Sequence, residues 1–368
     1  MTEPHATIAP QPGVLDIAPY VGGASHAPGA AKTIKLSSNE NPWGASPAAT
    51  AAYRAAASDL SLYPDPGSAS LRAAIAGAHG LNADRILCGN GSDELIALLC
   101  LAYAGVGDEV VYSRHGFLLY SISAMANGAT PVAAAEENLT ASVDNLLAAC
   151  TDRTRLVFIA NPNNPTGTRL NAQELARLAD GLPPKAMLVI DAAYAEFVAA
   201  EDYDGGVSLV ERRDNVVMTR TFSKIHGLAA LRLGWLYGPD HVIDALHRVR
   251  GPFNVNAAAQ AAGVAAMEDA DWVATCAART AELRAKMESE LTAMGAPTTK
   301  SSGNFVLAEF GTDAATGAAA ADAALKAAGV VARRMESYGL AGHLRISVGT
   351  EEETALALDV LKRWRAGL

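Results

Sequence analysis

Cysteine is scarce in this sequence and never paired. The four cysteines among the 368 residues lie far apart, at Cys88, Cys100, Cys150 and Cys276. None belongs to a Cys-x-x-Cys motif, and the histidines show no ligand spacing. This pattern is typical of reduced thiols in a cytosol, whereas a disulfide framework or a zinc site needs closely spaced ligands. We therefore expect no disulfide and no metal site.

Positive charge and long apolar runs are also scarce. The chain has 29 Lys and Arg against 39 Asp and Glu, for a net charge of −10, so no basic surplus exists to neutralise nucleic-acid phosphates. The longest apolar segment, residues 95–106, is too short to cross a bilayer. The first residues, MTEPHATIAPQPG, lack the basic start and apolar run of a secretory signal. The sequence thus predicts a soluble cytoplasmic protein without a nucleic-acid or membrane partner.

The residues that are present favour a compact α/β protein. Half of them are hydrophobic and 18% are charged, which is typical of a globular chain with a substantial core. Short apolar runs with strand character alternate with amphipathic segments such as NAQELARLADGL. The runs are RILCGN, DEVVYS, LVFIANP, AMLVIDAAY and NVVMTR. This alternation predicts a mostly parallel sheet covered by helices on both faces.

Changes in texture along the chain predict two domains. Residues 1–48 are rich in Pro and Gly, and we expect them to form an N-terminal arm that joins the small domain. Residues 49–255 carry the alternating pattern and form the predicted large domain. Ala-rich helices and a shorter strand–helix alternation fill residues 256–368, the predicted linking helix and small C-terminal α/β domain.

Polar residues directly follow four of the predicted strands. Ligands of an open parallel sheet bind beyond the carboxyl ends of its strands, so these residues are candidates for a site. The four segments are residues 89–94, 161–167, 191–194 and 221–224. Together they would bring a carboxylate, an amide cluster, a phenol, hydroxyls and one lysine to one edge of the sheet.

The first of these segments starts like a dinucleotide fingerprint. Gly89 and Gly91 give Gly-x-Gly, but Glu94 occupies the place of the third glycine. The signal is therefore weak, and a turn into a helix explains it better. The first NH groups of that helix, at Ser92 and Asp93, could hold a phosphate, although one of these residues could also be a simple N-cap.

Asp191, Tyr194 and Lys224 suit the chemistry of pyridoxal phosphate. A buried Asp191 would keep a pyridine nitrogen protonated, and Tyr194 would donate to a phenolate oxygen of the same ring. Lys224 would bond to the cofactor aldehyde as a Schiff base, because desolvation and neighbouring charge make a lysine nucleophilic. Taken alone, Asp191 could also cap the next helix.

Motifs spread over nearly the whole sequence carry a family resemblance. NPNNPTG, Asp-x-x-Tyr and a Ser-Lys pair eight residues before Arg232 occur together, and this combination is highly specific. Further matching segments are APYVGG, KLSSNENPWGASP, YPDPGSASLRAAIA, GNGSDELI, HGFLLYSISA, TFSKIHGLAALRLGW, RGPFNVN and HLRISVG. The chain thus resembles the fold-type I pyridoxal-phosphate aminotransferases, and among them the histidinol-phosphate aminotransferase family.

The resemblance implies a role for each residue on the cofactor side. Lys224 would form the imine with pyridoxal 5'-phosphate and carry a proton between substrate and cofactor. Asp191 would pair with the pyridinium nitrogen, while Tyr194 and Asn164 would bond the phenolic oxygen. Phe117 would stack on the ring, with plain core packing as its alternative. The phosphate cradle would consist of Ser92, Asp93, Thr221, Ser223 and Arg232.

The resemblance also implies contacts with the substrate and with a second subunit. Tyr63 would reach into the active site of the neighbouring subunit, so a homodimer would be obligatory. Arg345, assisted by Arg333, would bind the anionic group of the substrate. Tyr20 and Asn41 would contact the substrate from the arm, although Tyr20 could instead pin a loose arm.

Three positions depart from the pattern of the family. Gly22 stands where relatives often carry Pro, which should loosen the arm. His226 stands where an aromatic residue is commoner, and we expect a histidine packed in a helix. Arg334 follows Arg333 where Pro is frequent, so the sequence leaves open which of the two arginines faces the substrate.

The implied reaction converts L-histidinol phosphate and 2-oxoglutarate into imidazole-acetol phosphate and L-glutamate, in histidine biosynthesis, by a ping-pong mechanism. One site must then accept a carboxylate or a phosphate, which suits the guanidinium fork of Arg345. An aromatic or broad-range aminotransferase and a threonine-phosphate decarboxylase share the cofactor motifs and remain alternatives. The arm contains no helix-turn-helix, which argues against a cofactor-sensing transcription regulator. The incomplete glycine fingerprint argues against a nicotinamide dehydrogenase.

Overall fold

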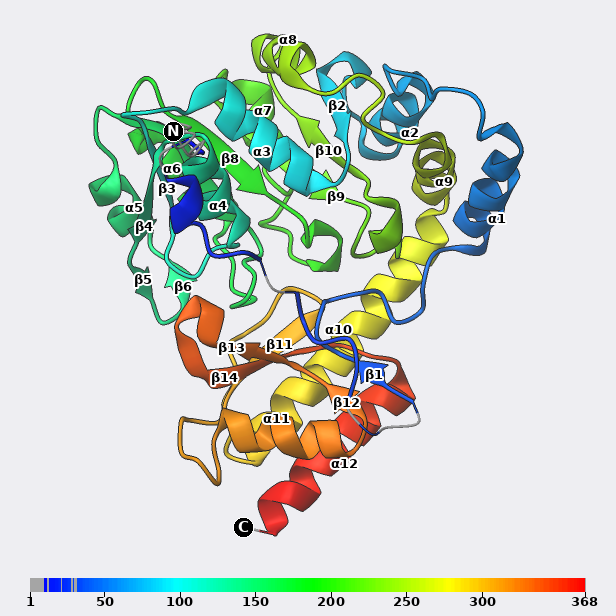
Figure 1. The fold of residues 1–368 in the computed structure, drawn as a ribbon, viewed down its shortest axis with the longest axis vertical. Coiled ribbons are helices and arrows are strands. Elements are labelled where there is room, and N and C mark those ends of the chain that lie inside the picture. Colours follow the sequence, from blue (N-terminus) through cyan, green and yellow to red (C-terminus); the bar gives the residue numbers. More distant parts are fainter. Residues whose placement is uncertain (1–9, 12, 21, 28, 30–31, 368) are drawn as a thin grey trace, which may run out of the picture.

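The chain divides into a large part and a small part. The computed structural model describes residues 10–11, 13–20, 22–27, 29 and 32–367. The large part is built on a seven-stranded sheet and the small part on a three-stranded sheet (Figure 1). The long helix α10 (Ala270–Ala293) runs from the edge of the large part along the small part, so it connects the two.

The central sheet of the large part is parallel except for one strand. Its strands, in order across the sheet, are β2 (Ile86–Gly89), β10 (Gly234–Tyr237), β9 (Val216–Thr221), β8 (Met187–Asp191), β7 (Thr154–Ala160), β3 (Glu109–Ser113) and β4 (Thr130–Ala134). Strand β10 runs antiparallel to both of its neighbours, and the pairs from β9 to β4 are parallel. The prediction of an α/β fold with a mostly parallel sheet is confirmed.

Helices cover both faces of this sheet because successive side chains of its strands point to opposite sides. In β7, Val157 and Ile159 belong to one hydrophobic core, whereas Leu156 and Phe158 belong to another. The helices of the large part are α1 (Pro47–Ala56), α2 (Ala69–His79), α3 (Ser92–Tyr103), α4 (Leu119–Ala126), α5 (Val143–Ala149), α6 (Ala172–Gly181), α7 (Val207–Arg212), α8 (Asp240–Val249) and α9 (Ala257–Glu268). A small hairpin of β5 (Glu136–Glu137) and β6 (Thr140–Ala141) lies beside them.

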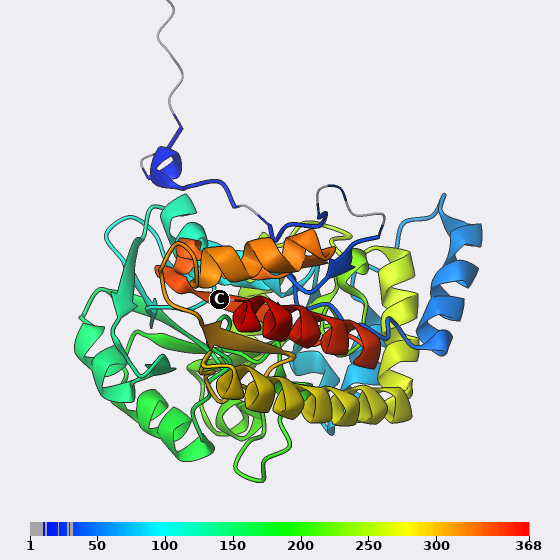
Figure 2. The ribbon, with the colours of Figure 1, turned by 90° about the horizontal axis from the view of Figure 1, so that it is seen from below.

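The small part is a sheet covered by three helices. Its antiparallel strands follow the order β11 (Phe305–Glu309), β14 (Leu340–Ser347) and β13 (Arg333–Met335). Figure 2 shows α10 lying alongside α12 (Glu351–Ala366) and α11 (Ala318–Ala327) over this sheet. Leu283 of α10, Leu325 of α11 and Leu358 of α12 share one core with Ile346 of β14.

The N-terminal arm and helix α9 each pack with one of the two parts. Strand β1 (Ile34–Lys35) of the N-terminal arm pairs in parallel with β12 (Val330–Val331), which places the arm strand in the small part. Helix α9 packs on α1 and α2, and its Ala259 and Ala262 lie in the core of the large part. Helix α9 thus packs with the large part, although it follows residue 255, where the sequence predicts the boundary. The domain limits themselves stay predictions.

The chemistry of the described residues adds three further facts. All four cysteines are free thiols. Across residues 10–367, leaving out the few positions not described, no helix is both long and apolar enough to cross a bilayer. The same residues contain no group of three His, Cys, Asp or Glu side chains that could hold a metal ion.

Candidate active site

A cavity between the two parts collects most of the predicted site residues. It lies at the carboxyl ends of β2, β7, β8 and β9, as expected for an open parallel sheet. The predicted residues that line it are Tyr20, Ser92, Asp93, Phe117, Asn164, Asp191, Tyr194, Thr221, Ser223, Lys224, Arg232, Arg333 and Arg345. The arm, the ends of four strands and the small part therefore contribute to a single site.

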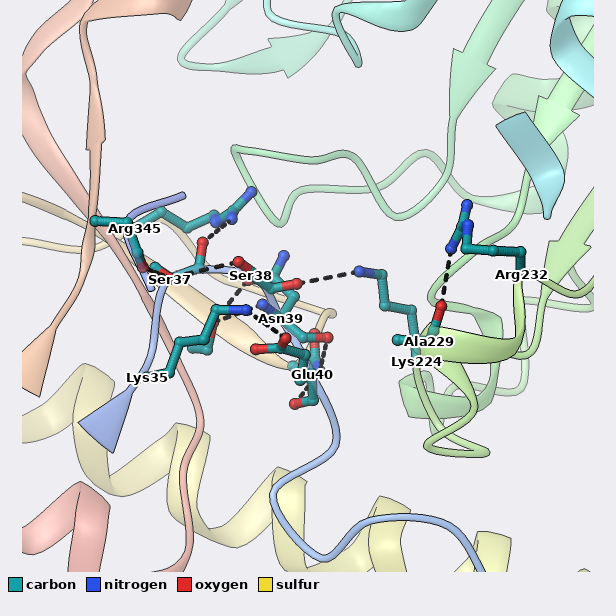
Figure 3. A network of polar contacts seen from close by, with 12 residues as sticks. Lys35, Ser37, Ser38, Asn39, Glu40, Lys224, Ala229, Arg232 and Arg345 are labelled. Carbon is teal, nitrogen blue, oxygen red and sulfur yellow. Dashed lines mark hydrogen bonds and ion pairs between the residues drawn. The ribbon is translucent and has the colours of Figure 1, made fainter. Parts of the chain in front are cut away.

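Lys224 lies in the turn after β9 and points toward the arm. Its Nζ donates a 3.3 Å hydrogen bond to the carbonyl oxygen of Ser38, and Figure 3 shows arm residues between this lysine and Arg345. Burial lowers the pKa of Lys224 to about 8, and the positive charge of Arg345 contributes to the lowering. A larger share of the amine is therefore neutral near pH 7 than for an exposed lysine, which makes it a better nucleophile.

Asp191 ends β8 as a buried carboxyl group with uncharged hydrogen-bond partners. Its Oδ2 accepts from the Tyr120 hydroxyl at 2.7 Å, and its Oδ1 accepts from Ala193 N at 3.3 Å and Thr219 Oγ1 at 3.5 Å. Burial raises the pKa of Asp191 to about 6, and the bond from Tyr120 opposes that rise. A carboxylate that lines a cavity and accepts only from neutral donors, as far as the chain is described, suits the protonated ring nitrogen of a pyridoxal ligand.

The N-terminus of α3 opens into the cavity without a side-chain cap. The N-cap position of this helix is Gly91, which has φ +84° and no side chain to cap the helix. The alternative that Ser92 or Asp93 is the N-cap is therefore wrong. A Cβ at Gly91 would lie 2.6 Å from the guanidinium of Arg232. The glycine thus leaves room for Arg232 to approach the free NH groups of the helix, an arrangement that attracts anions.

Hydroxyls and one guanidinium complete this anion cradle. Arg232 donates to Asp93 Oδ2 at 3.1 Å and to Ser223 Oγ at 3.4 Å. The hydroxyl of Thr221 accepts from Ser223 N at 3.1 Å, which fixes the turn that carries both residues. These donors fit a phosphate group, so the cavity has a place for each end of pyridoxal phosphate.

The cavity is also lined by Tyr194, Asn164 and Phe117. The Tyr194 hydroxyl accepts from Asn39 Nδ2 at 2.9 Å, and burial raises the pKa of this phenol. Asn164 accepts a short hydrogen bond from Arg345 through its Oδ1. The Phe117 ring meets the Tyr120 ring edge-on, with centroids 6.0 Å apart, and still lines the cavity.

Arg345 and Arg333 enter the cavity from paired strands of the small part. They lie opposite each other in the β13–β14 register. Arg345 is 6% exposed, donates to Ser37 O at 2.8 Å, and has a pKa that burial lowers. Arg334, in contrast, forms an ion pair with Glu336 and does not line this cavity. The structure therefore turns Arg333, not Arg334, toward the site.

Two predicted residues lie outside this cavity. Asn41 is engaged elsewhere, because it donates to Ile225 O at 2.7 Å and accepts from Trp43 N at 3.0 Å. Asn39, and not Asn41, is among the residues that line the cavity, and the substrate contact of Asn41 stays a prediction. Tyr63 is 83% exposed and stacks on Phe253 with centroids 4.6 Å apart.

The structure shows the environment of His226 and Gly22, two of the positions that depart from the family pattern. His226 is buried in a turn, not in a helix, with its ring centroid 5.0 Å from that of Phe222. Gly22 has an ordinary φ, and a Cβ added there would meet open space, so no close packing demands a glycine at this position.

Sequence reasoning missed several residues of the site. Ser38, Asn39 and Tyr338 line the cavity, and Tyr120 holds Asp191 from behind. Asn39 belongs to the matching segment KLSSNENPWGASP, so the motif indicates the segment that lines the cavity, although the sequence singled out Asn41 in it. Tyr120 belongs to the matching segment HGFLLYSISA, so the motif indicates its segment but not its bond to Asp191.

Comparison with known proteins agrees with this geometry. Residues 31–361 match the family model of aminotransferase class I and II. A histidinol-phosphate aminotransferase of Dinoroseobacter shibae is 55% identical, covering 98% of each chain, and one of Rhodospirillum centenum is 54% identical, covering 97% of this chain and 99% of the other. The crystal structure of histidinol-phosphate aminotransferase from Sinorhizobium meliloti in complex with pyridoxal-5'-phosphate superposes with a TM-score of 0.82 at 27% identity, covering 91% of this chain and 92% of that one. The chain belongs to the class I and II aminotransferases, within the histidinol-phosphate aminotransferase family.

Proposed function

We propose that this protein is the transaminase that converts L-histidinol phosphate and 2-oxoglutarate into imidazole-acetol phosphate and L-glutamate in histidine biosynthesis. The observation that carries the proposal is the meeting of Lys224, Asp191 and Arg345 in one cavity, with Asp191 and Arg345 buried and Lys224 half-buried. Amino transfer needs a nucleophilic amine, a carboxylate that pairs with the ring nitrogen of the cofactor, and a guanidinium that binds an anionic substrate. We also propose that the enzyme acts in the cytoplasm.

Each end of pyridoxal phosphate has candidate partners in the cavity. The N-terminus of α3 and Arg232 would hold the phosphate, and the carboxylate of Asp191 would hold the ring nitrogen. Tyr194 and Asn164 would bond the phenolic oxygen, and Phe117 would cover one ring face. When bound, the cofactor supplies an electron sink that stabilises negative charge at the α carbon of the substrate.

Lys224 is the group that moves the proton. Its Nζ, with a pKa of about 8, can take a proton from the substrate α carbon and return it during the same turnover. Asp191 stays close to ionised while a positive ring N–H faces it, because an opposite charge offsets the burial that raises its pKa.

Arg345 serves both half-reactions in this proposal. The guanidinium fork pairs with the α-carboxylate of glutamate, or with the phosphate of histidinol phosphate, through two parallel N–H bonds. Arg333 lies opposite it in the strand register and adds a second positive charge. One anion site can therefore accept two substrates whose other ends differ.

The function also calls for a homodimer. Tyr63 is 83% exposed, and Leu60 and Leu62 beside it are 79% and 68% exposed. Together with Phe253 they form an apolar surface of the kind that another subunit covers. We include in the proposal that Tyr63 acts in the site of the neighbouring subunit.

A parallel assay tests the substrate. The purified protein, supplied with pyridoxal phosphate and 2-oxoglutarate, should give a kcat/KM for histidinol phosphate well above those for phenylalanine and threonine phosphate. A higher value for phenylalanine would favour an aromatic or broad-range aminotransferase. Release of carbon dioxide from threonine phosphate would favour a decarboxylase.

A further inference from the structure

Asn39 touches the phenol of Tyr194 from a strained backbone position. It is a non-glycine residue with φ +56° and is 1% exposed. Its Nδ2 donates to Tyr194 Oη at 2.9 Å, its backbone N donates to Ser347 Oγ at 2.8 Å, and its carbonyl accepts from Asn304 at 3.0 Å. A left-handed conformation persists only where surrounding contacts hold it, and these three contacts do so.

Ser347 decides which end of the Asn39 amide faces Tyr194. Its hydroxyl donates to Asn39 Oδ1 at 2.9 Å while accepting from the backbone N of the same residue. If the amide were turned over, its N–H groups would face Ser347, and the serine proton would lose Asn39 Oδ1 as its acceptor. Ser347 is 2% exposed, so water does not replace the lost acceptor. The amide orientation is therefore determined by hydrogen bonding.

The orientation of the Asn39 amide determines whether the Tyr194 hydroxyl accepts or donates in the bond between them. Because Nδ2 of Asn39 brings only N–H groups, the phenol oxygen must accept from it, and the phenol proton is free to point elsewhere. Tyr194 lines the cavity, so the proton can be offered there. With the opposite amide orientation, the phenol would donate to Asn39 and present only lone pairs to the cavity.

We infer that Ser347 and Asn39 are positioning residues that make Tyr194 a hydrogen-bond donor toward the cavity. The inference rests on the proposed function, in which Tyr194 bonds the phenolic oxygen of the cofactor. Ser347 follows Arg345 by two positions on β14, so both side chains leave the same face of that strand. One strand of the small part thus binds the anion of the substrate and sets the direction of a proton in the large part.

The pH titration of the visible absorbance of the cofactor-loaded protein tests the inference without turnover. A donor at the phenolic oxygen stabilises its anion, so losing the donor should move the midpoint upward. For Tyr194→Phe we expect a shift of about one pH unit, the size of one hydrogen bond to a charged group. Ser347→Ala should shift the midpoint in the same direction by less, and should add nothing in the Tyr194→Phe background.

Thr354→Val provides the matched control. Thr354 is 1% exposed in the small part, and its hydroxyl accepts from Gly349 N without touching Asn39. This variant should leave the midpoint unchanged. A Ser347→Ala shift no larger than that of Thr354→Val, or one that persists in full without the Tyr194 hydroxyl, overturns the inference.

A second variant covers the case in which Ser347→Ala does not fold. Asn39→Asp presents only acceptor oxygens, so it should draw the Tyr194 proton away and raise the midpoint. Its shift should be smaller in the Tyr194→Phe background, where only the added charge acts. Equal shifts in both backgrounds overturn the inference. If Tyr194→Phe alone leaves the midpoint unchanged, the proposed role of Tyr194 fails as well, which separates the two failures.

Discussion

The hydroxyl of Tyr120 donates a 2.7 Å hydrogen bond to Asp191 from a helix on one face of the sheet. The Tyr120 ring is fully buried and stacks on Phe158, with centroids 4.7 Å apart. The carboxylate is therefore held from behind by a rigid neutral donor, and its other side is left to the cavity. A neutral partner leaves the charge of Asp191 available for the cofactor, which an ion pair would not.

Replacing Asp191 with Asn should affect activity and stability in opposite directions. An amide can still accept from Tyr120 but cannot hold a ring nitrogen protonated, so kcat should fall by several powers of ten. The cofactor-free variant should be more stable than the cofactor-free parent at pH 7, by about 3 kcal/mol, because the raised pKa of about 6 means that folding buries an unfavourable charge.

The sign of this effect follows from the raised pKa. Between about pH 4 and pH 6 the unfolded chain ionises Asp191 while the folded chain keeps it neutral, so the parent loses stability as the pH rises. Above about pH 6 the parent has lost all of the stability that the charge of Asp191 removes, and at pH 4 it has lost little of it. Denaturant unfolding at both pH values should therefore show a stability gain for the variant mainly at pH 7. Near-normal activity of the variant would show that Asp191 merely caps the following turn.

Lys224→Ala should abolish turnover and leave the cofactor removable by dialysis. The parent protein should be yellow as isolated, and the variant should lose the absorbance of the lysine-bound cofactor. Lys185→Ala, at an exposed position, provides the matched control and should keep both colour and activity. Repeated turnover by the Lys224 variant would contradict its assignment.

The pKa of Lys224 predicts how fast the cofactor-free protein takes up pyridoxal phosphate. Only the neutral amine attacks the aldehyde, so the rate of covalent attachment should rise with pH and level off above about pH 8. Stopped-flow absorbance measures this rate directly. A rate that continues to rise toward about pH 10, the ordinary range of an exposed lysine, would contradict the lowered pKa.

Mixing two inactive variants tests the shared site. If Tyr63 acts across the dimer, a Tyr63→Ala chain and a Lys224→Ala chain should together restore some activity, since one site of each hybrid has both residues intact. Each variant denatured and refolded alone gives the baseline. Hybrids that form, as shown by mass, but stay inactive would refute the shared site.

Arg345→Lys should weaken both substrates together. Lysine keeps the charge but loses the fork that also reaches Asn164 and Ser37, at a cost of about 1.5–3 kcal/mol for each substrate. That corresponds to roughly one to two powers of ten in kcat/KM. The measurement is the ratio of kcat/KM for glutamate and histidinol phosphate. A variant that loses only glutamate would argue against the dual role, and Tyr20→Phe should mainly affect the phosphate substrate.

The residues at strand ends could be predicted from the sequence better than those on the arm. Asp191 and Lys224 are found because parallel strands must end at the same edge of their sheet, whatever the details of packing. Asn39 and Asn41 cannot be told apart, because the arm has no repeating pattern and the left-handed backbone at Asn39 reverses which side chain turns inward. That conformation depends on Ser347 and Asn304, which lie at the other end of the sequence.

The role of Tyr120 could not be predicted from the sequence for a different reason. It lies in an apolar helix, where a buried tyrosine looks like ordinary core, and only the neighbouring carboxyl gives its hydroxyl a purpose. The sequence predicts the end of the large part at residue 255 because α9, which follows, is rich in alanine and shows no strongly apolar face. Its place on α1 and α2 comes from close approach of small side chains, which periodicity does not reveal.

The pairing of β1 with β12 has a consequence for the order of events on the ribosome. Ile34 is synthesised before the strands of the central sheet, but its partner Val330 is synthesised only after all of them. The central sheet draws all its strands from residues 86–237, so it can fold before the small part exists. The arm must wait as an unpaired strand, and Arg345 and Ser347 arrive later still. We therefore expect the nascent chain to hold a formed sheet long before it holds a working catalytic pocket, with the late, long-range closure as the slow step of its maturation.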